Sequence, residues 1–296
     1  MRPIKLLNIK TDYVFKRIFG REGNEQITKN FLSCILGEKV SDIELEKNPI
    51  LEKDLMDDKV GILDIKAEIN KNTNVDIEMQ IIDKKNSAKR ILFYCSKLFI
   101  KSLKSGKDYN SLKKTISILI ADYELDELKE VRKYITKWNI REEDCSKIIL
   151  TDAMEIYIIE IEKFKKYQGT ERYKELDSWI KFIENPEVVD MSNKEIVMAK
   201  KVLDEISQDE HERYLAEMRE KYILDQNATE AAGYDKGLKE GHKKGIEEGI
   251  KQGHEKGVEE GKKEIAKKML EEKLDLGLIE KVTNISKEEL KKMQEK

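Results

Sequence analysis

Strand-like segments occur only in the first part of this 296-residue chain, and this restricts the fold more than any other feature. Each segment is short, rich in Ile, Leu or Val, and bounded by polar or turn-forming residues. Helical patterns lie between them, at Asp12–Phe19, at Ile27–Leu36 with Gly37 ending the helix, and at Ser87–Lys104. This alternation predicts an α/β or α+β fold. The predicted strands are Gly61–Ile69, Val75–Ile82, Thr115–Ala121, Lys147–Leu150 and Glu155–Ile161.

The rest of the chain shows no strand pattern. Helices are predicted at Glu171–Ile183, Asn193–Ile206 and Glu210–Leu224. An internal repeat then places glycine at every fourth position from Gly233 to Gly261. Three short helices are predicted for residues 262–296. The sequence therefore predicts an all-α C-terminal region after the sheet-containing core.

Charge is abundant but almost balanced, with 57 Lys and Arg against 60 Asp and Glu. A protein that coats nucleic acid by bulk charge is thereby excluded, so such a contact needs a local basic face. No apolar stretch approaches the roughly 18 residues of a membrane span, and Met1–Lys10 lacks a secretory signal pattern. Cys34, Cys95 and Cys145 are too widely spaced for a disulfide framework or a zinc ribbon. We therefore expect a cytoplasmic protein.

The segment 61–82 contains candidate metal-binding residues. Its two strands alternate apolar and polar residues, and the link from Asn70 to Asn74 suits a hairpin turn. Pairing places Asp64 opposite Glu78 or Gln80, because side chains on one face of paired strands lie about 5 Å apart. Two such carboxylates suit Mg²⁺, which prefers oxygen ligands. The alternative is an ordinary half-exposed hairpin, although Asp is uncommon in strands.

Four blocks of the sequence are informative together: Asp12–Gly20, Ile62–Ala67, Asp76–Gln80 and Tyr157–Ile161, the last followed by Lys163-Phe164. In this order they resemble the recombination-promoting nuclease (Rpn) family of transposase-like proteins, a branch of the PD-(D/E)XK nuclease superfamily. The resemblance covers nearly the whole chain, including the glycine repeat, and implies an α/β fold with a mixed central sheet flanked by helices.

The resemblance implies a restriction-endonuclease-like core and a metal-dependent DNA endonuclease. Asp64, Glu78 and the backbone carbonyl of Met79 would hold Mg²⁺, which would activate a water and neutralise charge on the scissile phosphate. Gln80 stands where the superfamily usually has Lys; it can orient a water but cannot act as a base at neutral pH. The group that accepts the proton is left open. The implied role is DNA recombination, transposition or defence against foreign DNA.

Two further features near the hairpin each have two interpretations. Asp12 either completes the site from the first helix or caps a helix that starts at Tyr13. Lys89 and Arg90, at the start of the helix after the hairpin, either hold a phosphate or are simply solvated.

The expected organisation has four parts: a nuclease-like core at 1–190, a helical extension at 191–232, a glycine-repeat helix or linker at 233–262, and a helix-turn-helix-like tail at 263–296. The glycine stripe permits close approach of another helix, which favours self-association over a flexible tether. In the tail, Ser286 is predicted to cap the last helix. The expected partners are DNA and a second copy of the chain, with no membrane. The rival function is a catalytically degenerate nuclease fold that binds DNA or protein.

Overall fold

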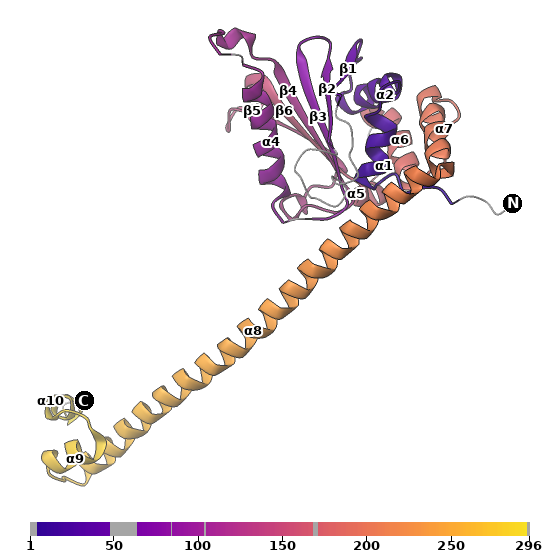
Figure 1. Ribbon diagram of the computed structural model, residues 1–296. Helices are drawn as coiled ribbons and strands as arrows, with labels where there is room; N and C mark the ends of the chain where they lie inside the picture. Colours follow the sequence, from indigo (N-terminus) through magenta and orange to yellow (C-terminus); the bar gives the residue numbers. More distant parts are fainter. Residues whose placement is uncertain (1–4, 48–63, 84, 104, 168–170, 295–296) are drawn as a thin grey trace. The chain divides into compact units, whose positions relative to one another are not determined.

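The computed structural model describes residues 5–47, 64–83, 85–103, 105–167 and 171–294, which fall into two compact units (Figure 1). The first unit is Met1–Gln226 and the second is Asn227–Lys296. A single long helix, α8 (Glu210–Glu271), begins in the first unit and continues in the second.

The first unit is built on a mixed six-stranded sheet in the order β1-β2-β3-β4-β6-β5 (Figure 1). The two inner pairs, β3–β4 and β4–β6, are parallel, and the three outer pairs are antiparallel. This confirms the predicted sheet flanked by helices. The strands are β1 (Ile43–Leu45), β2 (Ile65–Ile69), β3 (Thr73–Gln80), β4 (Lys114–Ala121), β5 (Ile135–Arg141) and β6 (Ile149–Glu160).

The strand predictions differ from the structure in three places. The two segments predicted at Lys147–Leu150 and Glu155–Ile161 are one strand, β6, because Thr151 between them pairs with Ile140 of β5 and Met154 pairs with Thr115 of β4. Strands β1 and β5 were not predicted: β1 has only three residues, and only the first residue of β5 is buried. The predicted start of the hairpin at 61–63 lies outside the described residues.

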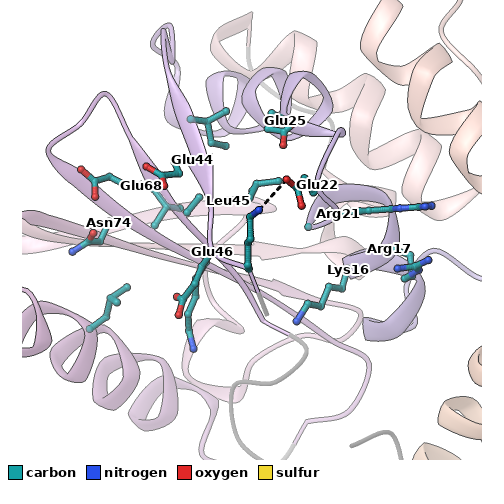
Figure 2. A pocket seen from close by; sticks show the side chains of 17 residues that line it. Lys16, Arg17, Arg21, Glu22, Glu25, Glu44, Leu45, Glu46, Glu68 and Asn74 are labelled. Carbon is teal, nitrogen blue, oxygen red and sulfur yellow. Dashed lines mark hydrogen bonds and ion pairs between the residues drawn. The ribbon is translucent and has the colours of Figure 1, made fainter. Parts of the chain in front are cut away.

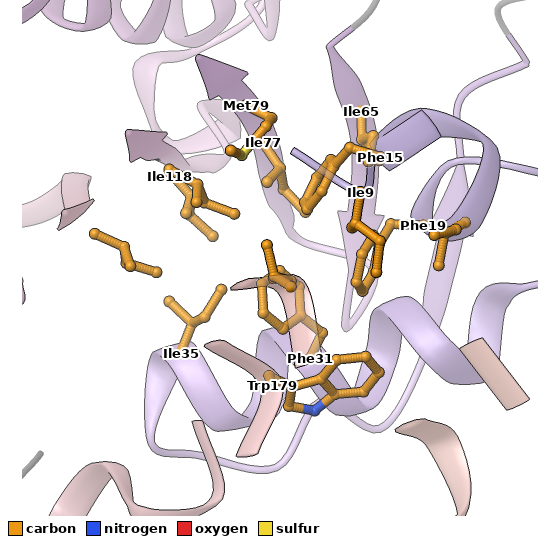
Figure 3. Packing of buried hydrophobic residues seen from close by; sticks show 14 of the residues in the cluster. Ile9, Phe15, Phe19, Phe31, Ile35, Ile65, Ile77, Met79, Ile118 and Trp179 are labelled. Atoms are coloured by element: carbon orange, nitrogen blue, oxygen red, sulfur yellow. The ribbon is translucent and has the colours of Figure 1, made fainter. Parts of the chain in front are cut away.

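One face of the sheet packs against α1 (Asp12–Phe19), α2 (Glu25–Leu36), α6 (Lys174–Glu184) and α7 (Lys194–Gln208). Trp179 of α6 packs at the centre of this core, with its ring centroid 5.3 Å from that of Phe31 and 5.5 Å from that of Phe19 (Figure 3). Ile65 and Ile77, which pair across the hairpin, face the same core. The hairpin is thus fixed to α1 through its apolar face.

The opposite face of the sheet is covered by α4 (Ser87–Lys101) (Figure 1). Ile91 of α4 packs in a second cluster with Leu119 and Ile158, from the central strands β4 and β6. The polar face of the hairpin therefore lies on the side of α4. Prediction placed this face away from the core, but part of it is buried: Asp76 is only 7% exposed.

The remaining elements of the first unit are short. They are α5 (Ile161–Lys166) and three 3₁₀ turns, η1 (Tyr109–Ser111), η2 (Asp126–Leu128) and η3 (Glu171–Tyr173). The predicted helices agree with α1, α2, α4, α6 and α7 to within a few residues, and Gly37 ends α2 in the left-handed conformation, with φ of 69°.

The second unit contains most of α8 together with α9 (Leu276–Thr283) and α10 (Lys287–Gln294). Ala266, Ile279 and Leu290 form its small core. The backbone N–H of Glu289 donates to Ser286 Oγ at 3.3 Å, which confirms the predicted cap. The whole glycine repeat is helical, and the side chains that follow the glycines are exposed. No helix among the described residues is long and apolar enough to cross a membrane.

Candidate active site

The β2–β3 hairpin brings the predicted carboxylates to one end of the sheet. Ile65, the first residue of β2, pairs with Ile77, so the antiparallel register places the preceding Asp64 opposite Glu78. The turn that sets this register spans 70–72, and both Asn70 and Lys71 have positive φ, of 50° and 63°. Local sequence thus positions Asp64 and Glu78 as predicted.

A third carboxylate, that of Asp76, lies beside these two. Asp76 precedes Glu78 by two residues on the same face of β3 and is buried. Its Oδ1 atom has no hydrogen-bond partner among the described residues. Burial raises the pKa of Asp76 to about 7, even though Lys66 pairs with it across the hairpin. Burial, together with Asp76 and Glu78, also raises the pKa of Asp64 well above its ordinary value. Carboxyl groups are thus crowded at this end of the sheet, and each disfavours the ionisation of its neighbours.

Glu78 is held by two other side chains. Gln80 Nε2 donates to Glu78 Oε1 at 2.6 Å, and Arg90 of α4 forms an ion pair with the same oxygen. Tyr123 Oη donates to Gln80 Oε1 at 2.7 Å, which fixes the orientation of the Gln80 amide. Arg90 is therefore not a simple solvated cation, because it forms an ion pair with Glu78. Lys89, its neighbour, is exposed.

Asp12 lies at the same pocket and is held from α8. Arg219 Nη2 donates to Asp12 Oδ2 at 2.7 Å, and Arg219 Nε lies 3.1 and 3.2 Å from the two carboxylate oxygens. The backbone N–H of Tyr13 also donates to Asp12 Oδ1. The helix begins at Asp12, with Thr11 in the N-cap position, so the interpretation of Asp12 as the N-cap is wrong.

These groups line one small pocket of about 80 Å³, between the end of β3, α4 and the first turns of α8. Met79 reaches it only through its backbone, because its side chain is buried in the core. The pocket-lining residues are Asp12, Glu78, Met79, Gln80, Ile81, Ile82, Arg90, Arg219, Tyr222, Ile223 and Gln226. The predicted site residues Asp12, Glu78, Met79 and Gln80 thus meet at one pocket, and Asp64 lies opposite Glu78 on the hairpin.

A larger cavity, of about 930 Å³, lies beside β1 and does not include these residues (Figure 2). Lys16 and Arg17 of α1 and the nearby Arg21 line it, together with acidic side chains such as Glu44 of β1 and the adjacent Glu46 (Figure 2). Opposite charges are mixed throughout this cavity, so it offers no concentrated set of metal ligands.

Sequence reasoning missed three members of the site. Asp76 could have been found, because it alternates with Glu78 and Gln80 on one strand face; its burial under α4 could not. Tyr123 and Arg219 carry no local signal, because they reach the site from residues far away in the chain. Among the described residues, no group of three or more Asp, Glu, His or Cys side chains is arranged to hold a metal ion.

The mixed sheet, the helix α1 and the carboxylate-bearing hairpin define a PD-(D/E)XK nuclease-like core. A family model described as PD-(D/E)XK nuclease family transposase matches residues 9–232. Another, described as the C-terminal HTH domain of the Rpn/YhgA-like nuclease family, matches residues 259–295. The chain therefore belongs to the PD-(D/E)XK nuclease family transposases, and the predicted resemblance to the Rpn family is confirmed. No curated protein and no solved structure shows significant similarity to it.

Proposed function

We propose that this protein is a metal-dependent endodeoxyribonuclease that hydrolyses phosphodiester bonds of DNA during recombination, transposition or defence against foreign DNA. The observation that carries the proposal is the cluster of Asp64, Asp76 and Glu78 at one end of the hairpin. Such a concentration of partly buried carboxylates destabilises a fold unless protons or a bound cation neutralise them, and a bound cation does so while they stay ionised.

The donors at this site suit Mg²⁺. Mg²⁺ is usually bound by one or two carboxylates, with water and substrate phosphate completing its coordination. Asp64, Glu78 and the Met79 carbonyl would hold it, and the unpartnered Asp76 Oδ1 adds a buried acceptor beside them. When bound, the ion would lower the pKa of a water and stabilise charge on the phosphate. A set of two carboxylates and a backbone carbonyl does not require three carboxylate, imidazole or thiolate ligands, and no group of three such side chains that could hold a metal is found among the described residues.

The chain's own residues fix the site before DNA enters. Tyr123 orients Gln80, and Gln80 in turn holds the Glu78 carboxylate. Arg90 supplies a positive charge at the pocket wall, where its guanidinium also lies 5.9 Å from the ring centroid of Tyr94. An arginine at this position suits a phosphate, whose oxygens match the guanidinium fork. We propose that Gln80 orients the attacking water.

Plasmid nicking tests the proposal. The wild-type protein should convert supercoiled plasmid to nicked circles with Mg²⁺ and should lose this activity with EDTA. Asp64→Ala should abolish it. Glu68→Gln is the matched control, because Glu68 lies on the same hairpin face but forms an ion pair with Lys113 at 2.6 Å, outside the site. If wild type and Asp64→Ala nick equally, or neither nicks, the protein is not such a nuclease; a gel shift with the same plasmid then tests the degenerate DNA-binding alternative.

We also propose that the second unit binds DNA through its helix-turn-helix and that α8 mediates self-association. A Cβ built on any glycine from Gly233 to Gly261 meets no atom within 4 Å, so the backbone there is open to a partner helix. Apolar side chains follow five of these glycines and are 44–68% exposed: Tyr234, Leu238, Ile246, Ile250 and Val258. Light scattering should give a mass above the monomer, and the full-length variant Leu238→Glu/Ile246→Glu should return it to the monomer. A monomeric wild type would exclude self-association.

A further inference from the structure

The first turns of α8 form polar contacts with α1. Glu212 of α8 accepts a hydrogen bond from Tyr13 Oη at 2.7 Å and forms an ion pair with Arg17. Two turns further along, Arg219 binds Asp12. These residues all belong to the first unit. Two ion pairs thus join the same two helices, but only the Arg219–Asp12 pair lies at the candidate active site.

Arg219 is held tightly at this pocket. The residue is only 6% exposed, and its guanidinium lies 5.0 Å from the ring centroid of Tyr222. Its Nε and Nη2 atoms contact both oxygens of Asp12. A guanidinium fork on a carboxylate fixes orientation as well as charge, which a lysine cannot reproduce. The Asp12 carboxylate is therefore neutralised and fixed in the pocket wall.

We infer that Arg219 is a positioning residue of the nuclease site and acts through Asp12. It holds Asp12 so that Asp64 and Glu78, rather than Asp12, are the carboxylates open to a divalent cation. This inference rests on the proposed function. It makes the first turns of α8 a part of the site, and it gives Asp12 a role in the site other than direct metal binding.

Electrostatics predicts the sign of each substitution. Arg219→Gln removes a positive charge and frees a carboxylate, so the site should bind a divalent cation more tightly. Asp12→Asn leaves Arg219 without that carboxylate and should weaken binding. The double variant removes both charges and should return close to the wild type. We expect each single substitution to change the affinity for the cation by about 10-fold, which is the order of the effect of residues that orient metal ligands.

The experiment is a titration of each full-length variant with Mn²⁺ alone, followed by calorimetry. Arg17→Gln is the matched control: it breaks the other ion pair between α1 and α8, but Arg17 lines the larger cavity and not the site. We expect Arg219→Gln to bind Mn²⁺ about 10-fold more tightly than the wild type. Arg17→Gln should have the wild-type affinity. The double variant Arg219→Gln/Asp12→Asn should lose the gain in affinity. If Arg219→Gln fails to fold, Arg219→Lys replaces it: this variant keeps the charge but loses the fork on Asp12, so a smaller gain in Mn²⁺ affinity is expected, and no gain would overturn the inference.

Three results would overturn the inference: unchanged or weaker binding in Arg219→Gln, the same gain in Arg17→Gln, or a gain that persists in the double variant. Nicking assays add a kinetic readout, in which Arg219→Gln should lower kcat with little change in KM for DNA, and Arg219→Lys should recover part of kcat. Absence of any Mn²⁺ binding by the wild type overturns both proposals. Binding that follows the expected pattern without Asp64-dependent nicking overturns the proposed function alone.

Discussion

The buried ion pair between Glu160 and Lys163 allows a sharp test of what stabilises the first unit. Glu160 is fully buried and Lys163 is 1% exposed, with Lys163 Nζ 2.9 Å from Glu160 Oε2. Glu160 Oε1 accepts a hydrogen bond from the backbone N–H of Leu125 at 2.8 Å, and Lys163 donates to the Leu128 carbonyl. The pair therefore joins the end of β6 to the connection that carries η2.

Lys163→Met should destabilise the unit by about 3–5 kcal/mol, because it leaves a buried carboxylate without its counter-charge. With a urea slope of about 2–3 kcal/mol per molar, the unfolding midpoint should fall by about 1–2.5 M. Fluorescence of Trp179 is the readout, because this residue lies in the core of the first unit. Adding Glu160→Gln should restore much of the loss. The double variant should remain about 1–3 kcal/mol less stable than the wild type, because the Leu128 carbonyl no longer has a hydrogen-bond donor.

The loss of stability in Lys163→Met should also depend on pH. Burial raises the pKa of Glu160 above its ordinary value even with Lys163 in place, and removal of the cation should raise it further. A carboxyl with a raised pKa in the folded state favours folding at low pH and loses that contribution as the pH rises through its folded pKa. Lys163→Met should therefore be less destabilised, relative to the wild type, at pH 5 than at pH 8.

An exposed ion pair with the same spacing provides the control. Asp126 and Lys129 lie 2.7 Å apart at positions i and i+3, but their side chains are 70% and 64% exposed. Lys129→Met should leave the midpoint unchanged. If Lys163→Met also unfolded at the wild-type midpoint, burial of an ion pair would not make its loss destabilising. The same conclusion would follow if the double variant were no more stable than Lys163→Met.

Three further predictions concern the site and the long helix. Tyr123→Phe should slow nicking about 10-fold, because the Gln80 amide loses the hydrogen bond that orients it, while Trp fluorescence stays unchanged. Arg90→Met should tighten Mn²⁺ binding measured by calorimetry, because Arg90 no longer occupies a Glu78 oxygen, and weaker binding would contradict this. Gly245→Ala should raise the helicity of α8, seen by circular dichroism, by favouring the helix by about 1 kcal/mol; unchanged helicity would contradict it.

Much of the first unit follows from local patterns. The bounds of α1 agree with the prediction because its apolar residues repeat at helical spacing and Gly20 follows it. The hairpin register was predictable because one face is apolar, and a slip of one residue would bury the charged face. Strand β5 was not predictable in this way. It is an edge strand, and Trp138 and Ile140 are both 46% exposed, so its pattern lacks a buried face.

The long helix shows where intrinsic propensity is a poor guide. Eight glycines at four-residue spacing weaken an isolated helix, yet the intervening Lys and Glu favour one, and the structure is helical from Glu210 to Glu271. Exposed ion pairs at i and i+4 lie along it, such as Lys263 with Glu259. A partner helix along the open glycine face would add the packing that most helices need.

The site was predictable only where the chain itself brings residues together. Asp64 and Glu78 are 14 residues apart and meet through a single turn, whereas Arg219 reaches Asp12 across a separation of 207 residues. No local pattern in α8 distinguishes Arg219 from the many other charged residues there. Its role depends on the packing of α8 against α1, and only the fold supplies that information.

Burial of the hairpin's polar face favours the interpretation of that face as a site over that of an ordinary half-exposed hairpin. An ordinary half-exposed hairpin would leave Asp64, Asp76 and Glu78 in water, where neighbouring carboxylates repel weakly. Here α4 covers the face, Asp76 is buried with an oxygen that has no partner among the described residues, and the pKa of Asp76 is raised to about 7. An apolar residue at position 76 would fit a purely structural strand better. Retention of a destabilising carboxylate beside two others fits a site that a cation completes, and it motivates the Mn²⁺ titrations above.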